Sequence, residues 1–521
     1  MTRQAITVFG AGYVGLVTAA GLAELGHDVV CVDTDRARIA ALRERAAPPF
    51  HEPELKAMIR RHAASGRLRF AEGDDAEAVA QARLFFIAVG TPSSADGAAD
   101  VGQVLAVARG IGRRLEADAL VVVKSTVPVG TGDAVRAAVL GELPGRGRGD
   151  LRVAVVSNPE FLREGCAVAD WLAPDRIVVG SDDAQALATM RALYAPLVAH
   201  RRQWQPMRLR SAELTKYASN AMLAARVSVM NELALMAEPL GADIAEVKRG
   251  VAGDPRIGEA FLACGCGYGG SCLPKDLRAL QSMAAAAGVP VPLLAAVERV
   301  NERQKTLLAE RALAALAAAG AAGPPLHGCR VALWGLAFKP GTDDLREAPS
   351  EAVLHTLVEA GVQVVAHDPL AMPAARAQHE RLAASFTTAP DALAAVDGAD
   401  ALLIVTEWPE YAAADWAAVR RRMRGRLVFD GRNVCDPARM VAQGFVYRGI
   451  GRLVPRAPVA AVGSMAALAP AARPVAAMVP STPAAPATAA APAATAAANA
   501  AATAAANAAA TAAAAAAAAG D

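Results

Sequence analysis

The segment VFGAGYVG, residues 8–15, constrains the fold most, because it follows an apolar strand and opens a helix. Its glycines, Gly10, Gly12 and Gly15, have the G-x-G-x-x-G spacing, and Asp33 ends the next predicted strand. Together these features are typical of a dinucleotide-binding βαβ unit. The first two glycines let the backbone approach a pyrophosphate at the helix N-terminus, and the third permits helix–strand packing. Asp33 would accept from ribose hydroxyls and repel a 2′-phosphate, which favours NAD over NADP; an FAD site or a glycine turn without a ligand are the alternatives.

Three blocks and a tail divide the 521-residue chain. Residues 1–205 and 323–452 alternate apolar strands with helical patterns, which is typical of doubly wound parallel sheets. Residues 206–322 are helical in pattern, and residues 453–521 are alanine-rich and of low complexity. We therefore expect an α/β protein with two Rossmann-like domains joined by a central helical segment, followed by a disordered tail. The strands are predicted at 5–10, 28–33, 84–90, 120–126, 152–160, 176–180, 329–335, 362–368, 399–407 and 426–433.

Charge and cysteine content exclude several classes of protein. The 53 basic and 51 acidic residues nearly balance, so nothing indicates a nucleic-acid partner. Seven cysteines lack a repeated spacing, and the pair Cys264 and Cys266 has no second pair or histidine cluster to complete a metal site. We expect no metal, and a reducing cytoplasm as the location. The N-terminus has no signal-peptide pattern, and outside the tail no apolar run reaches the length of a membrane span.

Cys272 lies in GYGGSCLPKD, residues 267–276, directly before a predicted helix. Pro274 suits the first turn of that helix, and leucines at helical spacing follow it. A helix N-terminus and a nearby cation, for which Lys275 is a candidate, would lower the pKa of the thiol and favour the thiolate. A buried structural cysteine is the alternative.

Polar side chains gather at other predicted strand ends and on one helix face. Thr91, Ser125 and Thr126 follow strands at the edge where ligands bind in such sheets, although ordinary turn chemistry would also explain them. The loop NPEFLREG, residues 158–165, supplies carboxylates at Glu160 and Glu164 that fit either acid/base chemistry or a helix start.

Lys216 and Asn220 lie four residues apart on one face of a predicted helix that should point inward. A lysine on such a face indicates a ligand or a carboxylate partner, unless it lies at the helix edge. Asp276 follows Cys272 by four residues, so both can face one pocket.

The motifs in their order resemble those of the UDP-glucose/GDP-mannose dehydrogenase family over residues 1–450. They are GAGYVGL, VGTP, STVPVGT, NPEFLREG, ELTKYASNA, GDPRIG, GYGGSCLPKD, WGLAFKPGTDDLRE and DGRN. The resemblance implies NAD on the first domain and a sugar nucleotide on the second. The tail has no counterpart in it, and the cysteines in FLACGCG depart from the pattern.

The resemblance also implies a reaction, the oxidation of a C6 hydroxymethyl to a carboxylate with two NAD⁺. Cys272 would capture the intermediate aldehyde as a thiohemiacetal and then a thioester. Lys216 would stabilise the oxyanion, and Asn220 would contact the sugar oxygens. Asp276 would act through a water in hydrolysis, aided by Thr126 and Glu160.

Ligand contacts are implied in the same way. Those to NAD are Gly10, Gly12, Gly15, Asp33, Arg38, Thr91, Thr126, Glu164, Lys275 and Arg346. Those to the sugar nucleotide are Phe161, Leu162, Arg163, Glu164, Lys216, Asn220, Arg256, Phe261, Leu262, Gly265, Gly269, Lys339 and Arg432. Arg256 resembles an arginine that reaches the neighbouring subunit, which implies a homodimer.

Several functions stay open at this stage. GDPRIG and FL-x-x-G-x-GYGGSC favour UDP-glucose over GDP-mannose as the substrate. A single-oxidation dehydrogenase of the 6-phosphogluconate or 3-hydroxyacyl-CoA kind shares the glycine fingerprint and the Lys-x-x-x-Asn helix face but does not need Cys272. A non-catalytic protein that binds a partner through its tail is the third alternative.

Overall fold

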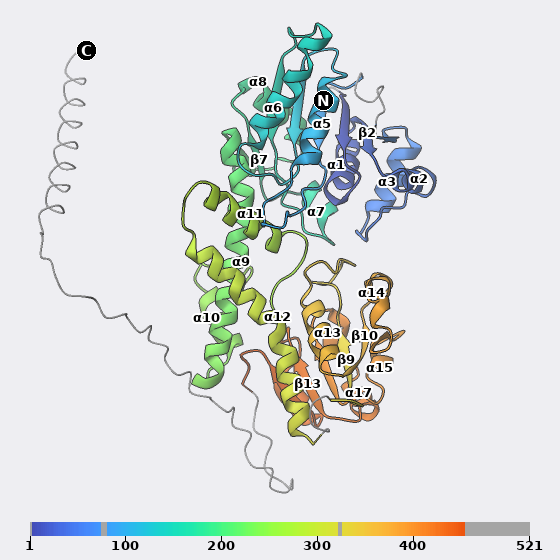
Figure 1. Ribbon diagram of the computed structural model, residues 1–521, viewed down its shortest axis with the longest axis vertical. Helices are drawn as coiled ribbons and strands as arrows, with labels where there is room; N and C mark the ends of the chain where they lie inside the picture. The colour runs from blue at the N-terminus through green and yellow to red at the C-terminus, as the bar shows by residue number, and fades with distance from the viewer. Residues whose placement is uncertain (1–2, 74–80, 321–325, 454–521) are drawn as a thin grey trace, which may run out of the picture. The chain divides into compact units, whose positions relative to one another are not determined.

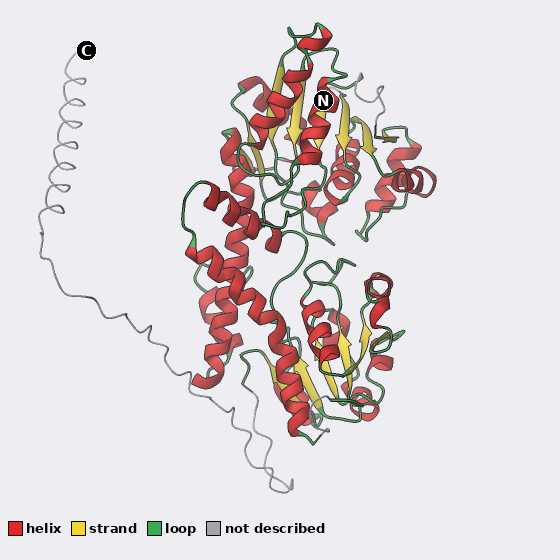
Figure 2. Ribbon diagram, in the orientation of Figure 1, coloured by secondary structure: helices red, strands yellow, loops and turns green. Residues whose placement is uncertain are grey.

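Two β-sheets, separated in the chain by a run of long helices, organise the protein (Figures 1 and 2). The computed structural model describes residues 3–73, 81–320 and 326–453, all of which fall in one compact unit, residues 1–457. The tail predicted to be disordered, residues 453–521, lies outside the described residues from position 454 onward.

The first sheet has eight strands in the order β3-β2-β1-β4-β5-β6-β7-β8. The strands from β3 to β6 in this order are parallel, but β7 pairs antiparallel to β6 through Ser157 and Gly180. The expectation of a wholly parallel sheet is wrong at this edge, because a buried strand reads as an apolar run in either direction. The strands are β1 (Ala5–Phe9), β2 (Asp28–Asp33), β3 (Leu68–Glu72), β4 (Leu84–Ile87), β5 (Ala119–Val123), β6 (Val153–Ser157), β7 (Ile177–Gly180) and β8 (Trp204–Met207).

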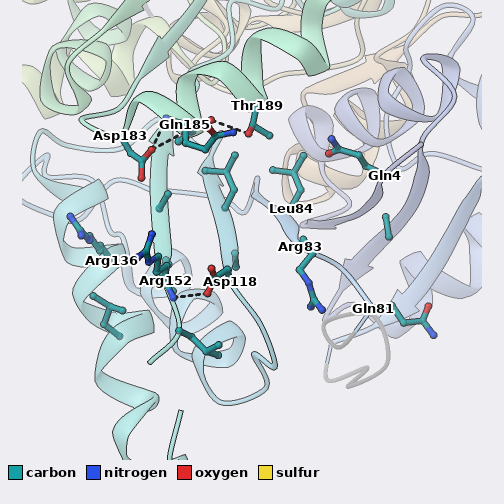
Figure 3. Close-up of a pocket in the computed structure, with 18 residues that line it drawn as sticks. Gln4, Gln81, Arg83, Leu84, Asp118, Arg136, Arg152, Asp183, Gln185 and Thr189 are labelled. Atoms are coloured by element: carbon teal, nitrogen blue, oxygen red, sulfur yellow. Dashed lines mark hydrogen bonds between the residues drawn. The ribbon is translucent and has the colours of Figure 1, made fainter. Parts of the chain in front are cut away.

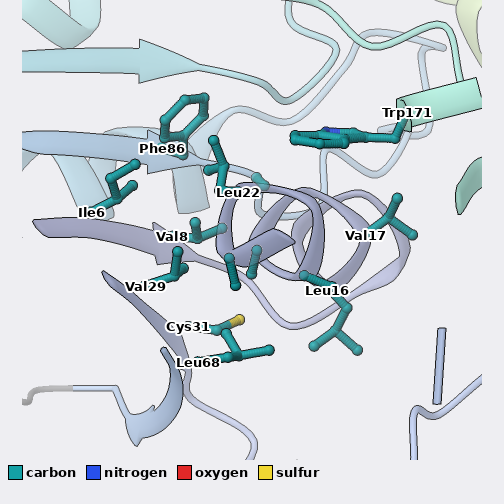
Figure 4. Packing of buried hydrophobic residues seen from close by; sticks show 14 of the residues in the cluster. Ile6, Val8, Leu16, Val17, Leu22, Val29, Cys31, Leu68, Phe86 and Trp171 are labelled. Carbon is teal, nitrogen blue, oxygen red and sulfur yellow. The ribbon is translucent and has the colours of Figure 1, made fainter. Parts of the chain in front are cut away.

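Apolar side chains of helix α1 and of the strands form the core of this sheet (Figure 4). Trp171 closes this core, since a Cβ added at Gly21 of α1 would lie 2.3 Å from its ring. The helices of this block are α1 (Tyr13–Glu24), α2 (Arg36–Arg45), α3 (Leu55–Ala64), α5 (Gly102–Gly112), α6 (Thr131–Glu142), η1 (Pro144–Arg146), α7 (Ala167–Leu172), α8 (Ala184–Tyr194), η2 (Ala195–Leu197) and η3 (Arg201–Gln203).

Long helices follow, as the sequence predicts. They are α9 (Leu209–Leu240), α10 (Ile244–Ala252), α11 (Leu273–Ala286) and α12 (Pro292–Ala318). Helix α9 ends at Gly241, whose φ of 70° only glycine adopts readily. Ala221 and Ala224 of α9 pack with Leu277 of α11 and Val297 of α12, so the helix that carries Lys216 is held against the helix that follows Cys272.

The second sheet repeats the first in its topology. Its six strands run parallel in the order β11-β10-β9-β12-β13-β14, which matches β3-β2-β1-β4-β5-β6 strand for strand. The elements are β9 (Arg330–Trp334), α13 (Pro349–Glu359), β10 (Gln363–His367), α14 (Met372–Gln378), η4 (Glu380–Leu382), β11 (Phe386–Thr388), α15 (Ala392–Ala395), β12 (Ala401–Ile404), α16 (Pro409–Ala412), α17 (Trp416–Arg422), β13 (Leu427–Asp430), α18 (Pro437–Ala442) and β14 (Val446–Gly449).

The two sheets also share the same kind of glycine turn, which follows β1 in the first sheet and β9 in the second. Gly10 follows β1 and Gly335 follows β9, with φ of 102° and 98°. The aspartate near the end of the next strand braces each turn: Asp33 accepts from Ala11 N, and Asp368 accepts from Leu336 N. Two Rossmann-like halves are therefore present, and the predicted fold class is confirmed.

The predicted domain boundaries at 205, 322 and 452 stay predictions. The first falls within β8, the second between α12 and β9, and the third beyond β14. Among the described residues, none of the helices has both the length and the apolar character that crossing a bilayer demands.

Candidate active site

In the glycine turn after β1, two of the three glycines have no room for a side chain, and the third faces open space. Gly10 and Gly15 are held by packing, since an added Cβ would lie 2.6 Å from Ala88 O and 1.8 Å from Gly10 O respectively. Gly12 caps α1, and an added Cβ there would meet nothing within 4 Å. The open space and the unbonded N–H groups of the first turn suit a pyrophosphate, so the residues present fit a dinucleotide. Gly10 and Gly15 are therefore required by the packing of the turn itself.

Asp33 and Arg38 lie together beside this turn. The carboxylate of Asp33 accepts from Ala11 N at 2.6 Å and from Arg38 Nη1 at 3.0 Å. Arg38 also pairs with Asp35 at 3.4 Å. The expected ribose acceptor and an expected NAD contact therefore both lie at the edge of the open turn.

Two of the hydroxyls expected in the crevice hold the backbone. Thr91 Oγ1 donates to Thr126 O at 2.8 Å, and Ser125 Oγ donates to Val89 O at 2.7 Å. For these two side chains the structure shows the ordinary turn chemistry that the sequence left as an alternative. Glu213 of α9 fixes the same region, because its carboxylate accepts from Gly130 N and Gly132 N at 2.7 Å each.

Lys216 meets a carboxylate, as its inward face predicts. Its Nζ lies 2.9 Å from Glu160 Oε1, and both side chains are about 5% exposed. Burial raises the pKa of Glu160, but Lys216 and the N–H of Leu162 outweigh it, so the pKa stays below its usual value. Burial likewise lowers the pKa of Lys216, but Glu160, Cys272 and Asp276 together outweigh it, so the pKa lies above its usual value. Both groups therefore carry their charges, and Lys216 offers a fixed cation.

Asn220 and Asp276 form the other half of the cluster. Asn220 Nδ2 donates to Asp276 Oδ2 at 2.7 Å, and both side chains are buried. Lys275 Nζ donates to Asp276 Oδ1 at 2.6 Å. Two segments 56 residues apart thus share one hydrogen bond next to the start of α11.

Cys272 is the N-cap residue of α11, with Pro274 in the first turn, as predicted. Burial raises the pKa of its thiol, and Lys216 opposes that rise without cancelling it. The expectation of a lowered pKa is therefore wrong in this structure, since desolvation outweighs the nearby cation. The cation that acts on the thiol is Lys216, whereas Lys275 is engaged with Asp276.

Glu164 joins the loop 158–165 to the second half of the chain. It accepts from Ser271 Oγ at 3.1 Å and from Thr342 Oγ1 at 3.4 Å, and it lies 3.6 Å from Arg346. Burial and the charge of Asp344 raise the pKa of Glu164 to about 7. This expected ligand contact is therefore the carboxylate of the loop that titrates near neutral pH.

The other expected residues of that loop have partners on the first sheet. The Arg176 guanidinium lies 3.8 Å from the centroid of the Phe161 ring, and Lys216 Nζ lies 5.3 Å from it. Leu162 packs on the core around α1. Arg163 is exposed and makes a bidentate pair with Asp170.

The expected substrate loop before Cys272 packs tightly on the second sheet. A Cβ at Gly265 would lie 2.5 Å from Gly431 O, and one at Gly269 would lie 2.2 Å from Glu347 O. Leu262 is buried, and Phe261 is exposed with a φ of 59°. Arg432 donates to Gly267 O at 2.9 Å and so holds this loop against the strand ends.

The two cysteines that depart from the family pattern are buried in this loop. Cys264 Sγ lies 3.7 Å from Ile450 O, and Cys266 Sγ lies 3.5 Å from Val405 O. Burial raises the pKa of Cys264 to about 11. Both thiols therefore act as small packing groups.

Arg256 and Lys339, which are also expected to contact the sugar nucleotide, make no hydrogen bond to the Cys272 cluster among those described above. Arg256 is exposed and pairs with Asp254 in a bidentate fashion. Lys339 Nζ lies 5.6 Å from the centroid of the Phe338 ring and is near enough to Glu164 to lower its pKa slightly.

Two residues that the sequence does not single out support the site. Glu52 is buried and accepts from Tyr13 Oη and from Gly165 N, which ties the glycine turn to the loop 158–165. Lys124 donates to Asn158 at 3.2 Å, and burial lowers the pKa of Lys124 to about 8. Lys124 lies in the KSTVPVG run, so its polarity inside an apolar strand was an available signal; Glu52 lies in irregular chain and had none.

A cavity of about 890 Å³ lies elsewhere, at the opposite edge of the first sheet (Figure 3). It is lined by residues at the start of β1, β4, β5 and β6, such as Ala5, Leu84, Ala119 and Val153. None of the expected site residues lines it. This cavity is therefore separate from the candidate active site, which the arrangement of side chains identifies.

A glycine turn with space for a dinucleotide, two Rossmann-like halves and the Cys–Lys–Asn–Asp cluster are typical of a dinucleotide-dependent dehydrogenase. Comparison with known proteins gives the family. Its NAD binding domain matches residues 4–198, its central domain residues 210–303 and its UDP binding domain residues 332–437. The chain belongs to the UDP-glucose/GDP-mannose dehydrogenase family. It is an NAD-dependent oxidoreductase whose substrate is a UDP-sugar.

Relatives with known names agree with this placement. The chain is 49% identical to the UDP-glucose 6-dehydrogenase of Pseudomonas aeruginosa, covering 87% of this chain and 98% of the relative. It is 43% identical to that of Rhizobium meliloti, covering 86% and 99%. The solved UDP-glucose dehydrogenase of Pyrobaculum islandicum is 40% identical, with a TM-score of 0.77 and coverage of 87% and 98%.

Proposed function

We propose that this enzyme oxidises the C6 hydroxymethyl of UDP-glucose to the carboxylate of UDP-glucuronate, and that Cys272 is its nucleophile. The observation that carries the proposal is the cluster at the start of α11, in which the partly buried Cys272 lies near the buried Lys216, Asn220 and Asp276. A dehydrogenase that oxidises its substrate once does not need a thiol there. The UDP-glucose 6-dehydrogenases of Pseudomonas aeruginosa and Rhizobium meliloti support UDP-glucose as the sugar nucleotide.

The thiol acts between two oxidations. When bound, NAD⁺ would accept one hydride in each oxidation. The first oxidation of the alcohol yields an aldehyde and a proton. The Cys272 thiolate then adds to the aldehyde carbon and forms a thiohemiacetal, whose oxidation gives a thioester. Water cleaves the thioester and releases the carboxylate and the thiol. Covalent capture keeps the aldehyde in the site for the second step.

Lys216 stabilises the oxyanion that forms when the thiolate adds, because its charge is fixed in a buried place by Glu160. Asn220 contacts the reacting oxygen. Asp276 takes the proton of the hydrolytic water, for which its hydrogen bond to Asn220 fixes its orientation. Thr126 and Glu160 support this step.

The remaining proposals concern the residues that contact NAD and the UDP-sugar. Gly12, Asp33 and Arg38 form the open cradle for NAD on the first sheet. The other proposed contacts to NAD are Gly10, Gly15, Thr91, Thr126, Glu164, Lys275 and Arg346, and those to the UDP-sugar are Phe161, Leu162, Arg163, Glu164, Lys216, Asn220, Arg256, Phe261, Leu262, Gly265, Gly269, Lys339 and Arg432.

The test is product analysis with NADH counting. With UDP-glucose we expect UDP-glucuronate by mass spectrometry and two NADH for each molecule formed. One NADH per product would refute the double oxidation, and faster turnover of GDP-mannose would refute the choice of sugar. Cys272→Ser should lose uronate formation but keep NAD binding; full uronate formation by this variant would remove Cys272 from the mechanism.

We further propose a homodimer formed through α9. Large apolar side chains are exposed along this helix at seven-residue spacing, namely Met222, Val229 and Met236. Arg226, between the first two, donates to Ile257 O at 2.8 Å and so anchors the loop that carries Arg256 beside this face. The exposed Arg256 would then reach the sugar site of the partner.

The compartment is proposed as the cytoplasm. All seven cysteines are free, and Cys166 is exposed. A reducing environment keeps such thiols reduced, and the thiol chemistry of Cys272 requires it.

A further inference from the structure

Three metal-ligating side chains meet in the second sheet's layer of helices, away from the hydrogen bonds of the active site. Glu351 and His355 lie four residues apart on α13, and His379 follows α14. One ligand atom from each side chain lies within 4.8 Å of the other two. Exposed carboxylates gather often without an ion, but this group combines two imidazoles with one carboxylate.

The cluster is built rather than accidental. His379 is 5% exposed, and its Nε2 lies 2.9 Å from Glu351 Oε1. Its ring packs edge-on against Phe386 at 5.4 Å between centroids, and Gln378 Nε2 donates to Glu351 Oε2 at 2.9 Å. Two of the three ligands are therefore fixed in position by packing and hydrogen bonds, as the ligands of a metal site are.

The third side chain, His355, lies at the protein surface and leaves the site accessible to solvent. The ring of His355 lies 5.9 Å from that of His379, and the residue is exposed. An ion can enter from this side and keep a water as its fourth ligand. Ligand atoms of a tetrahedral zinc site lie about 3.3 Å apart. To accept the ion, the 2.9 Å contact between Glu351 and His379 would widen by about 0.4 Å, and the exposed His355, whose ligand atom lies within 4.8 Å of the other two, would move inward.

We propose that Glu351, His355 and His379 bind one divalent transition-metal ion of the zinc class, with one open position for water. The ion would link α13 to the chain between α14 and β11. None of the three side chains is among the proposed catalytic or ligand-binding residues. The site would therefore stabilise the second sheet and leave the chemistry at Cys272 unchanged.

Cobalt titration of the full-length protein tests this proposal. Co²⁺ reports its ligands by its spectrum, because thiolate ligation adds strong near-ultraviolet charge transfer that nitrogen and oxygen ligands lack. A Cys272→Ser background removes the partly buried active-site thiol as a competitor. We expect one Co²⁺ per chain, visible bands without thiolate charge transfer, and displacement by Zn²⁺.

Substitutions of the proposed ligands test whether Co²⁺ binds at this cluster. His355→Ala removes an exposed ligand and Glu351→Gln keeps the side-chain shape, so both should fold, which circular dichroism checks. Each should weaken Co²⁺ binding at least about tenfold. His327→Ala removes an exposed histidine outside the cluster and should bind as the parent does. Absence of binding at saturating Co²⁺, thiolate charge transfer, or unchanged affinity in His355→Ala and Glu351→Gln would each overturn the proposal.

Discussion

The three glycines of the turn after β1 have one sequence pattern but two physical roles. Gly15 is closed by the carbonyl of Gly10, whereas Gly12 faces open space. Gly15→Ala should therefore lower the free energy of unfolding by about 3 kcal/mol or more, because overpacking against backbone cannot relax cheaply. Gly12→Ala should change it by about 0.5 kcal/mol or less. Urea denaturation measures both.

The variants Gly12→Ala and Gly15→Ala also distinguish an effect on NAD binding from an effect on folding. Gly12→Ala should fold and weaken NAD binding at least about tenfold, since a methyl group occupies the place of the pyrophosphate. Calorimetry with NAD measures this. Gly12→Ala that binds NAD as the wild type does would remove the turn as the cofactor site, and a fully stable Gly15→Ala would contradict the packing.

The charge balance around Cys272 gives a pH dependence. Burial raises the pKa of the thiol, and Lys216 holds that rise in check. Below the pKa, each further unit of rise reduces the thiolate fraction about tenfold. Lys216→Met should therefore shift the rise of Cys272 alkylation by iodoacetamide to higher pH. Mass spectrometry of the modified peptide measures the rate of Cys272 alkylation from about pH 6 to about pH 10. The exposed Lys56→Met serves as the control, and an unshifted profile in Lys216→Met would contradict the pairing.

At the scale of elements, the loop 158–165 is held to the later segments through Glu164. Its pKa of about 7 in the folded protein exceeds the ordinary value of 4.5. The folded state thus binds a proton that the unfolded chain releases between these values. Stability contributed by this group is present at acidic pH and falls as pH rises from 4.5 to about 7, by at most about 3 kcal/mol.

Glu164→Gln should remove this part of the pH dependence, because the amide keeps the shape and does not titrate. Thermal unfolding between pH 4.5 and 8 measures the slope for the wild type and the variant without ligands. Exposed Glu359→Gln should keep the wild-type slope. Equal slopes in Glu164→Gln and the wild type would show that Glu164 is not protonated in the fold.

The elements that the sequence missed share a physical character. Strands β3 and β8 lie at the two edges of the first sheet, and β11 and β14 lie at the two edges of the second. Edge strands like β3 and β11 bury less surface, so their apolar signal is weaker than that of the central strands. The glycine turn, the long helices and the buried central strands were predictable because each has a strong local pattern.

At the scale of the whole molecule, the exposed face of α9 predicts assembly. Met222 is 65% exposed and Met236 is 54% exposed. Met222→Asp should halve the mass measured by light scattering after size exclusion, since a buried carboxylate without a partner opposes association. The exposed Lys56→Glu also adds negative charge, away from this face, and should leave the mass unchanged. A wild-type monomer, or a dimer that survives Met222→Asp and Met236→Asp together, would contradict the interface.

The two α/β halves, the glycine turn at residues 10–15 and the helix start at Cys272 were all predictable from the amino-acid sequence, because each depends on residues near one another in the chain. The sequence also brought Lys216 and Asn220 to one helix face. The tertiary structure alone decided their partners, since Glu160, Asp276 and Cys272 come from separate segments. It also decided that desolvation raises the thiol pKa, and that His379 joins Glu351 and His355. Burial and contacts between distant segments are properties of the packed chain, so no local pattern encodes them.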